Sequence, residues 1–269
     1  MMSVVCSTYN RGHLLRKSLE CYANQLLSVP FEIIVLDDGS SDDTEDVVRD
    51  WANDIDIKYV ALWTNKKVWR DCAMTLNMGI RAAKGDVIIC THPEVMPGPC
   101  SLQDLWDNRA EKTYLACKVY YLTPRDQERL DGLAILTYDA PAAVRSLPDF
   151  YRQHSTEVRG NPDYTPQMMD KHTSWNSFVF GGFTKETWRW FGGFTEFAQW
   201  GSIDVDFLNR RNVLGIPTYT AMEPDTFVVH QNHDVMTHST DVLTPRDMDK
   251  AMSNLPVYRT PDEARLGHI

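Results

Sequence analysis

Short strand-like runs alternate with helix-like segments over the first third of the chain, and this alternation limits the fold more than any other feature. The runs cover residues 3–7, 31–36, 57–62 and 87–90, and they are largely apolar and rich in β-branched residues, as is typical of buried parallel strands. Helical periodicity fills the gaps, and the third helix is predicted over residues 68–83. Three β-α units joined by short links predict an α/β fold, with a mostly parallel, Rossmann-like central sheet flanked by helices. The second helix is expected to begin with a capping box, because Glu45 follows Asp42 at a spacing of three.

Polar residues follow three of the four predicted strands at their carboxyl ends. They are residues 8–11 after the first strand, Asp37 and Asp38 after the second, and His92 and Glu94 after the fourth. Carboxyl ends of parallel strands meet at one edge of a sheet, where open α/β sheets bind their ligands. Residues two apart in an extended segment point the same way, so His92 and Glu94 are predicted to face one pocket as ligands of a divalent metal. The alternative for this pair is a helix-capping or exposed histidine beside an ordinary surface carboxylate.

Composition and motifs argue against several classes of protein. The formal charge of −10 disfavours a general nucleic-acid surface, and no apolar run approaches the length of about 18 residues that a membrane span needs. The N-terminus lacks the basic segment of a signal peptide, and the six cysteines are scattered without a CxxC pair, so we expect a cytoplasmic protein with reduced thiols. No GxGxxG motif follows the first strand and no GxxxxGK[ST] motif occurs, which disfavours a dinucleotide-binding dehydrogenase and a P-loop NTPase.

Three segments in order form a more specific pattern than any of them alone. They are Ser7-Thr8-Tyr9-Asn10-Arg11, Val35-Leu36-Asp37-Asp38-Gly39-Ser40-Ser41-Asp42-Asp43-Thr44 and Leu76-Asn77-Met78-Gly79-Ile80-Arg81-Ala82-Ala83-Lys84-Gly85-Asp86. With these segments the chain resembles the family 2 glycosyltransferases of the GT-A fold over about residues 3–95, and the resemblance resumes near residues 181–216. It implies one GT-A domain over residues 1–233, with a nucleotide-binding half at 1–100 and an acceptor-side half at 101–233, followed by a C-terminal extension at 234–269.

The resemblance also implies a nucleotide pocket in the first half of the chain. The residues expected to line or support this pocket are Thr8, Tyr9, Arg11, Asp37, Asp38, Arg70 and Asn77. Among them, Asp38 would hold the base and Asp37 would support the same loop. Arg70 and Asn77 would face the nucleotide or its phosphates.

The metal motif of the family is present in an altered form after the fourth strand. Family members have Asp-x-Asp there, whereas this chain has His92-Pro93-Glu94. The resemblance implies a divalent metal held by His92 and Glu94, with His230 as a third ligand from the end of a late strand. The alternative for His230 is a plain surface histidine. Histidine is a softer ligand than carboxylate, which favours Mn²⁺ over Mg²⁺. The cation would let a pocket of acidic side chains hold a diphosphate, which those side chains alone would repel.

Residues 192–211 carry the second part of the resemblance. A Gly-Gly-Phe turn is followed by Trp200-Gly201-Ser202-Ile203-Asp204, where the family has Trp-Gly-x-Glu-Asp. The first acid is lost and the second is retained, so the resemblance assigns Asp204 as the general base that takes the proton from the acceptor hydroxyl. Asp206 is the second candidate for this role, and Trp200 is expected either to stack on a sugar or to lie in the core. The alternative for Asp204 is a helix N-cap.

The remaining segments are less regular. We predict a helix over 101–110, strands over 114–122, 133–138, 177–183 and 226–230, and a helix over 184–191 with Thr184 as its cap. Residues 148–175 are predicted as a long surface loop, either a lid over donor or acceptor or a disordered insertion. Residues 234–269 show helix-like patches and are expected to pack on the domain or on a partner chain.

The expected function is an inverting, metal-dependent transfer of a sugar from a nucleotide-diphosphate sugar, with a UDP-sugar as the expected donor, to an acceptor hydroxyl. The acceptor is left open among a glycan, a protein side chain, a lipid-linked sugar and a small molecule, and the acidic charge disfavours a nucleic acid. Two alternatives stay open. A sugar-phosphate nucleotidyltransferase would share the sheet, but residues 8–12 do not supply its Gly-rich, Arg-containing loop. A nucleotide-sugar or glycan-binding module that has lost its chemistry would explain His92 and Ile203 in place of acids.

Overall fold

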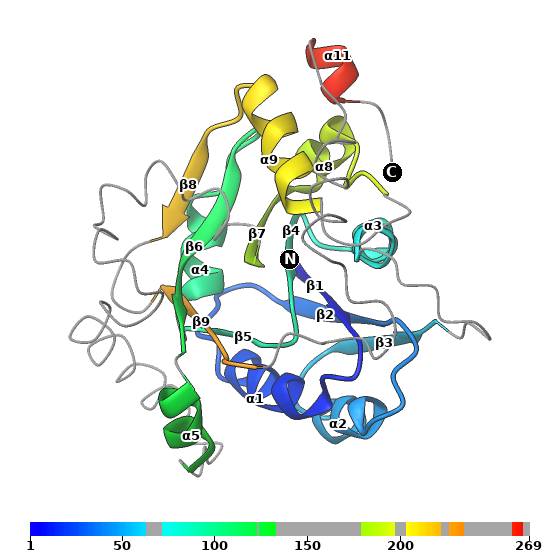
Figure 1. Ribbon diagram of the computed structural model, residues 1–269. Helices are drawn as coiled ribbons and strands as arrows, with labels where there is room; N and C mark the ends of the chain where they lie inside the picture. Colours follow the sequence, from blue (N-terminus) through cyan, green and yellow to red (C-terminus); the bar gives the residue numbers. More distant parts are fainter. Residues whose placement is uncertain are drawn as a thin grey trace.

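The computed structural model describes residues 1–62, 72–122, 124–132, 179–196, 203–221, 226–233 and 260–265 (Figure 1). Arg70 and Trp200, the strand predicted over 133–138 and the loop predicted over 148–175 lie outside the described residues. The described chain forms one curled sheet with helices on both faces, which confirms the predicted α/β fold.

The first half of the sheet has the predicted parallel arrangement. β1 (Met2–Thr8) lies between β2 (Phe31–Asp37) and β4 (Val87–Thr91), and β3 (Ile57–Ala61) lies outside β2, all in parallel. Thr8 pairs with Asp37 and Cys6 pairs with Thr91, so the carboxyl ends of β1, β2 and β4 meet at one edge. This edge, called the ligand edge below, carries most of the residues predicted to bind ligands.

The second half of the sheet is mixed in direction. β7 (Phe180–Thr184) runs antiparallel to β4 and to β6 (Tyr114–Tyr121), whereas β8 (Thr218–Ala221) and β9 (Phe227–His230) run parallel to β6. β7 approaches β4 closely because Gly182 has no side chain: a Cβ at this position would overlap the carbonyl oxygen of Ile88.

A short strand, β5 (Val95–Pro97), forms one end of the strand order. Only residues 92–94 separate β5 from β4, yet β5 pairs with β9 at the far end of the strand order. The chain therefore leaves a central strand and returns to the sheet beside the last one (Figure 1). As a result, residues 92–94 lie next to the carboxyl end of β9, where Val95 pairs with His230.

Helices cover both faces of the sheet and bury two apolar layers. One layer receives side chains from α1 (Gly12–Ala23), α2 (Thr44–Trp51) and α4 (Ser101–Asp107), and the other from α3 (Ala73–Ala82), α8 (Lys185–Phe191) and α9 (Ile203–Val213). Successive side chains along a strand point to opposite faces, so Val4 of β1 lies in the first layer and Val5 in the second. Figure 1 shows α1 and α2 on one side of the sheet and α3, α8 and α9 on the other.

The structure confirms one predicted helix cap and corrects the other. Thr184 is the N-cap of α8 and accepts a hydrogen bond from Thr187 N at 3.2 Å, as predicted. The capping box at the start of α2 is wrong, because the N–H of Thr44 donates to Asp42 Oδ1 at 3.2 Å and Glu45 forms an ion pair further along the helix. Aspartate readily makes such a turn with the backbone two residues on, and this turn replaces the box.

Other helices differ from the prediction in their bounds or were not predicted at all. α4 ends at Asp107 rather than at residue 110, and the described part of α3 begins at Ala73. α5 (Pro124–Gly132) follows β6, and α11 (Pro261–Ala264) packs on α9, where Arg210 Nε donates to Ala264 O at 2.7 Å. Residues 260–265 of the C-terminal extension thus pack on the domain. Within the described ranges, no helix combines the length and the apolar character that crossing a bilayer requires.

Candidate functional site

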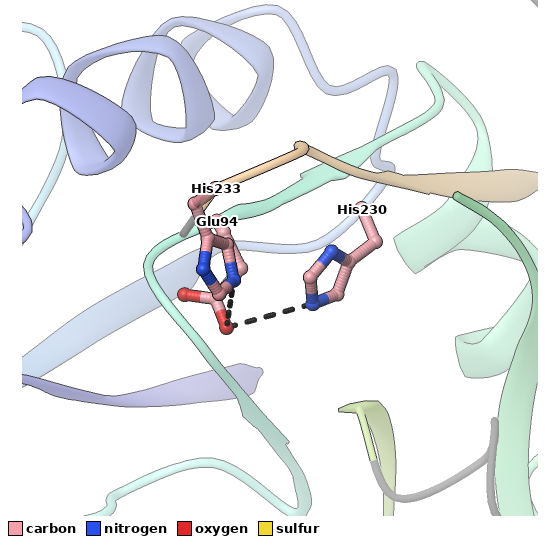
Figure 2. Close-up of side chains that lie close together, drawn as sticks. All are labelled: Glu94, His230 and His233. Carbon is pink, nitrogen blue, oxygen red and sulfur yellow. Dashed lines mark ion pairs between the residues drawn. The ribbon is translucent and has the colours of Figure 1, made fainter. Parts of the chain in front are cut away.

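A cluster of one carboxylate and two imidazoles lies at the ligand edge. Glu94 comes from the three-residue link between β4 and β5, and His230 and His233 come from the end of β9 and the residues after it. The backbone joins the two segments, because Gln231 N donates to Glu94 O at 2.9 Å. Figure 2 shows the three side chains turned toward one another.

The geometry of this cluster suits a metal ion. Glu94 Oε1 lies 3.6 Å from His230 Nε2 and 3.7 Å from His233 Nε2, and one ligand atom from each residue lies within 4.8 Å of the others. Ligands at about 2.1 Å from a common ion are separated from one another by roughly 3 to 3.5 Å, so a small inward movement would complete the site. The side chains are only 13% to 19% exposed. Three protein ligands leave further coordination positions for a substrate, as catalytic metal sites require.

The protonation states at neutral pH also suit a metal. Burial by itself raises the pKa of Glu94, but the neighbouring His233, His92 and His230 outweigh it and lower that pKa to about 2. Burial lowers the pKa of His230 to about 4, against the opposing pull of Glu94. At pH 7 the carboxylate is therefore ionised and the imidazole of His230 is neutral, which are the forms that bind metal ions.

The ring of His230 is oriented for this role by its neighbours. Its Nδ1 lies 2.8 Å from Gln231 O, and a carbonyl oxygen only accepts, so Nδ1 carries the proton and Nε2 has its lone pair free to bind a ligand. The ring also lies against Tyr121, with 4.8 Å between ring centroids. A backbone carbonyl on the far nitrogen is a common way to fix the tautomer of a metal-binding histidine.

The described cluster contains His233 where the sequence analysis predicted His92. The prediction assumed that residues 92–94 continue the strand, so that His92 and Glu94 share a face. Instead β4 ends at Thr91, and Val95 N donates to His92 O at 3.2 Å, which closes a turn. His92 acts on Glu94 through its charge but does not belong to the cluster formed by the three ligand atoms. The only sequence signal for His233 is its spacing of three from His230.

The predicted nucleotide pocket lies where β1 and β2 end, and two loops are joined there. Asp38 N donates to Thr8 O at 3.0 Å, and Asn10 N donates to Ser40 Oγ at 2.8 Å. Asp37 lies at the start of the second loop, and its Oδ1 accepts from Ser40 N at 2.8 Å. The hydroxyl of Thr8 is buried and has no hydrogen-bond partner among the described residues.

Tyr9, Arg11 and Asp38 are half-buried at the same place. Arg11 is the N-cap residue of α1, and its carbonyl oxygen accepts from Leu15 N at 2.9 Å. The structure thus gathers these three predicted residues with Thr8 around the two joined loops.

Asn77 has a different environment from the one predicted. Its side chain is fully buried, Nδ2 donates to Phe194 O at 2.9 Å, and Oδ1 accepts from Phe194 N at 2.9 Å. Nδ2 also donates to Glu196 Oε1 at 3.0 Å. The amide is therefore committed to the backbone of the Gly-Gly-Phe segment, and we assign Asn77 to holding that segment on α3 rather than to contacting a nucleotide.

A series of hydrogen bonds links the helix that carries Asp204 to α3. Thr75 Oγ1, in the first turn of α3, is 2.6 Å from Ser7 Oγ near the carboxyl end of β1, so α3 begins at the ligand edge. Asn77 ties α3 to residues 194–196, and Thr195 in turn donates to Asp206 Oδ2 at 2.6 Å. These bonds connect the first turn of α9 to α3. Asp204 is the second residue of this helix, inside the first turn, so it is not the N-cap.

Asp206, the second candidate for the base, is 1% exposed and accepts the hydrogen bond from Thr195. Ile203 is also buried and packs in the apolar layer of α3, α8 and α9. Asp204 is half-buried between these two anchored residues and is the carboxylate of this turn with the better access to solvent.

Comparison with known proteins points to one family. Residues 3–132 match the family model "Glycosyl transferase family 2". The chain is 29% identical over 224 residues to the hyaluronan synthase of Pasteurella multocida, covering 77% of this chain and 22% of that protein. It is 30% identical over 235 residues to the validoxylamine A glucosyltransferase of Streptomyces hygroscopicus subsp. jinggangensis, covering 83% of this chain and 54% of that protein. The chain thus spans between about a fifth and a half of these relatives.

Solved structures share the fold. The chain is similar to S. aureus TarS 1–349 in complex with UDP-GlcNAc, with a TM-score of 0.63 and 16% identity, covering 93% of this chain and 64% of that one. It is also similar to the mannosyltransferase PcManGT from Pyrobaculum calidifontis in complex with GDP-Man and Mn²⁺, with a TM-score of 0.51 and 20% identity, covering 85% and 56% of the two chains.

Proposed function

The chain belongs to glycosyl transferase family 2, with the GT-A fold, and from this we propose that it is an inverting glycosyltransferase that moves a sugar from a nucleotide-diphosphate sugar to an acceptor hydroxyl. The observation that carries the proposal is the cluster of Glu94, His230 and His233 at the ligand edge, the edge at which β1 and β2 also end. The chain has a net negative charge, and acidic side chains repel a diphosphate. A cation bound by this cluster would offset that repulsion.

The metal proposed for this cluster is a divalent transition metal, with Mn²⁺ preferred over Mg²⁺. Two imidazole nitrogens and one carboxylate oxygen suit Mn²⁺ and its neighbours better than Mg²⁺, which prefers oxygen ligands. PcManGT, which shares the fold, was solved with Mn²⁺. The bound ion would act as a Lewis acid toward charge on the departing diphosphate. Glu94, His230 and His233 would hold it, and the ionised carboxylate offsets part of its charge.

The donor proposed is a UDP-sugar. Thr8, Tyr9, Arg11 and Asp38 would line the nucleotide pocket, with Asp38 on the base. The solved TarS chains with UDP-GlcNAc and with UDP support this choice, since their fold is shared by this chain. The acceptor is open among a glycan, a protein side chain, a lipid-linked sugar and a small molecule, and the assay below is designed to screen these classes.

Asp204 is proposed as the general base. It would accept the proton of the acceptor hydroxyl as that oxygen attacks the anomeric carbon from the face opposite the diphosphate, which inverts the configuration. The first acid of the family pattern is Ile203 here, and Ile203 packs in the core, so Asp204 is the acid of that pair that remains available.

The test is a screen of nucleotide sugars with Mn²⁺, scored by release of the nucleoside diphosphate and by transfer to acceptors of the four classes. Asp204→Asn is expected to lower transfer by about 10² to 10⁴, which is what a general base contributes. Thermal stabilisation by UDP with Mn²⁺ should be unchanged in the same variant, since a ligand that binds the folded state still raises its stability.

Asp206→Asn is the matched control, because an amide oxygen at this position still accepts from Thr195 and transfer should persist. Unchanged turnover in Asp204→Asn would rule out the base assignment. The second candidate function is a nucleotide-sugar or glycan-binding module without transfer, and the replacement of acids by His92 and Ile203 favours it. Stabilisation by nucleotide and Mn²⁺ with no transfer to any acceptor class would support that module instead.

A further inference from the structure

Two fully buried polar side chains lie between α1 and the segments that carry the metal cluster. Ser18, on the inner face of α1, donates to Pro93 O at 2.6 Å. Gln231 donates through Nε2 to Leu14 O at 3.0 Å and approaches Ser18 Oγ at 3.5 Å. Pro93 is adjacent to Glu94 in the chain, and Gln231 lies between His230 and His233. One turn of α1 therefore holds the backbone on both sides of the cluster.

The direction of these hydrogen bonds follows from counting protons. Ser18 has one hydroxyl hydrogen, and Pro93 O at 2.6 Å is a nearer acceptor than Leu14 O at 3.4 Å. With its hydrogen engaged there, Ser18 Oγ is an acceptor toward Gln231 Nε2. The result is a chain of donors that runs from Gln231 through Ser18 to Pro93, with no free choice of orientation. The remaining oxygen of Gln231, Oε1, is buried and has no hydrogen-bond partner among the described residues.

We propose that Ser18 and Gln231 are positioning residues for the metal cluster, and that α1 is the common reference that sets the distance between Glu94 and the two histidines. This inference rests on the proposed metal site. The segments that α1 joins are far apart in the sequence, since Gln231 and Leu14 are separated by 217 positions and Ser18 and Pro93 by 75. A metal tolerates deviations of only about 0.2 Å in its ligand distances, so loss of this link would misplace ligands without removing any of them.

A second contact supports the same role for the surroundings of Gln231. Asn232 N donates to Gln127 Oε1 of α5 at 2.9 Å, so the segment from His230 to His233 is held from both sides. Outer hydrogen-bond partners of metal ligands commonly contribute a factor of 10 to 100 in metal affinity. Gln231 and Gln127 hold the segment that carries the histidines, whereas Ser18 holds the Glu94 side of the cluster through the carbonyl of Pro93.

The experiment compares Ser18→Ala and Gln231→Met with the wild type in the full chain. Affinity for Mn²⁺ alone is measured by calorimetric titration, and the Co²⁺-bound chain is compared by its visible absorption bands, which report ligand geometry. Each variant is expected to bind Mn²⁺ about 10- to 100-fold more weakly and to show altered Co²⁺ bands. Methionine has nearly the length of glutamine and removes Oε1, which is buried without a hydrogen-bond partner in the part of the chain that the structure describes, so the melting temperature of Gln231→Met should fall little. The losses in the double variant should be less than additive, because both residues belong to one link.

Ser3→Ala is the matched control for a purely structural effect. Ser3 is also fully buried and donates to Glu32 Oε1 at 2.7 Å, but it lies at the amino end of β1, away from the cluster. It should lower the melting temperature and leave Mn²⁺ affinity unchanged. Wild-type affinity in both Ser18→Ala and Gln231→Met would overturn the inference while leaving the proposed transferase intact. A wild-type chain that binds neither Mn²⁺ nor Co²⁺ would overturn the metal site and this inference together. The donor screen would then decide separately whether the chain transfers a sugar.

Discussion

Replacing Asn77 by leucine tests how the structure joins its two halves. Asn77 sits on α3, fully buried, and its amide both accepts from Phe194 N and donates to Phe194 O. Leucine has the same number and branching of side-chain heavy atoms, with bulkier methyl groups, so the change removes hydrogen bonds without opening a cavity. The resemblance implies that Asn77 faces the nucleotide, whereas its hydrogen bonds to Phe194 indicate a role in the scaffold, so the two explanations predict different outcomes.

The magnitude follows from the groups that lose their partner. The N–H and the carbonyl of Phe194 would each lose a buried hydrogen bond, at about 1 to 3 kcal/mol per group. The third bond, to Glu196, ends on an exposed side chain and adds little. We expect a total loss of about 3 to 4 kcal/mol in the free energy of unfolding. For a chain of this length that corresponds to a fall of roughly 10 °C in melting temperature.

The assay is urea unfolding followed by circular dichroism, with UDP and Mn²⁺ titrated into the folded variant at low temperature. Asn108→Leu is the control: Asn108 is exposed and donates to Asp104 O at 2.9 Å, so the same substitution should change stability by less than about 0.5 kcal/mol. Nucleotide affinity should be the same in the wild type and in Asn77→Leu. A variant that keeps wild-type stability and binds nucleotide more weakly would refute the scaffold role and would instead support contact between Asn77 and the nucleotide.

Two further predictions concern stability alone. Gly182→Ala should cost more than about 3 kcal/mol, since the new Cβ meets the backbone of Ile88, which cannot move without breaking the β4–β7 pairing; a normal yield and melting temperature would contradict the close packing of these strands. Glu20 is 7% exposed, and burial, only partly offset by Lys17, raises its pKa to about 7. The folded chain then holds the proton of Glu20 more tightly than the unfolded chain does. The contribution of this group to the free energy of unfolding is therefore complete below pH 4.5 and is lost as the pH rises toward 7. Glu20→Gln should therefore be more stable than the wild type at pH 8, by at most about 3 kcal/mol, and no more stable at pH 4 in urea titrations.

The alternation of strands and helices, and the edge at which ligands would bind, were readable from the sequence. Strand and helix periods are local properties, and the apolar runs over residues 3–7, 31–36 and 87–90 each became a buried strand. Parallel strands share the edge at which they end, so Thr8, Asp37 and Glu94 were brought to one side of the molecule without any knowledge of long-range contacts. The cap at Thr184 was equally local, since it depends on residues three apart.

The composition of the site depended on contacts that no local pattern encodes. His233 replaces His92 in the cluster because the chain turns at residues 92–95 and because β5 pairs with β9, which begins about half a chain length later. Asn77, which the resemblance places at the nucleotide, donates instead to the backbone of Phe194, 117 positions away. A hydrogen bond between distant segments forms only once the whole sheet has fixed their positions, so tertiary structure alone decided which polar side chains face a ligand and which hold the scaffold.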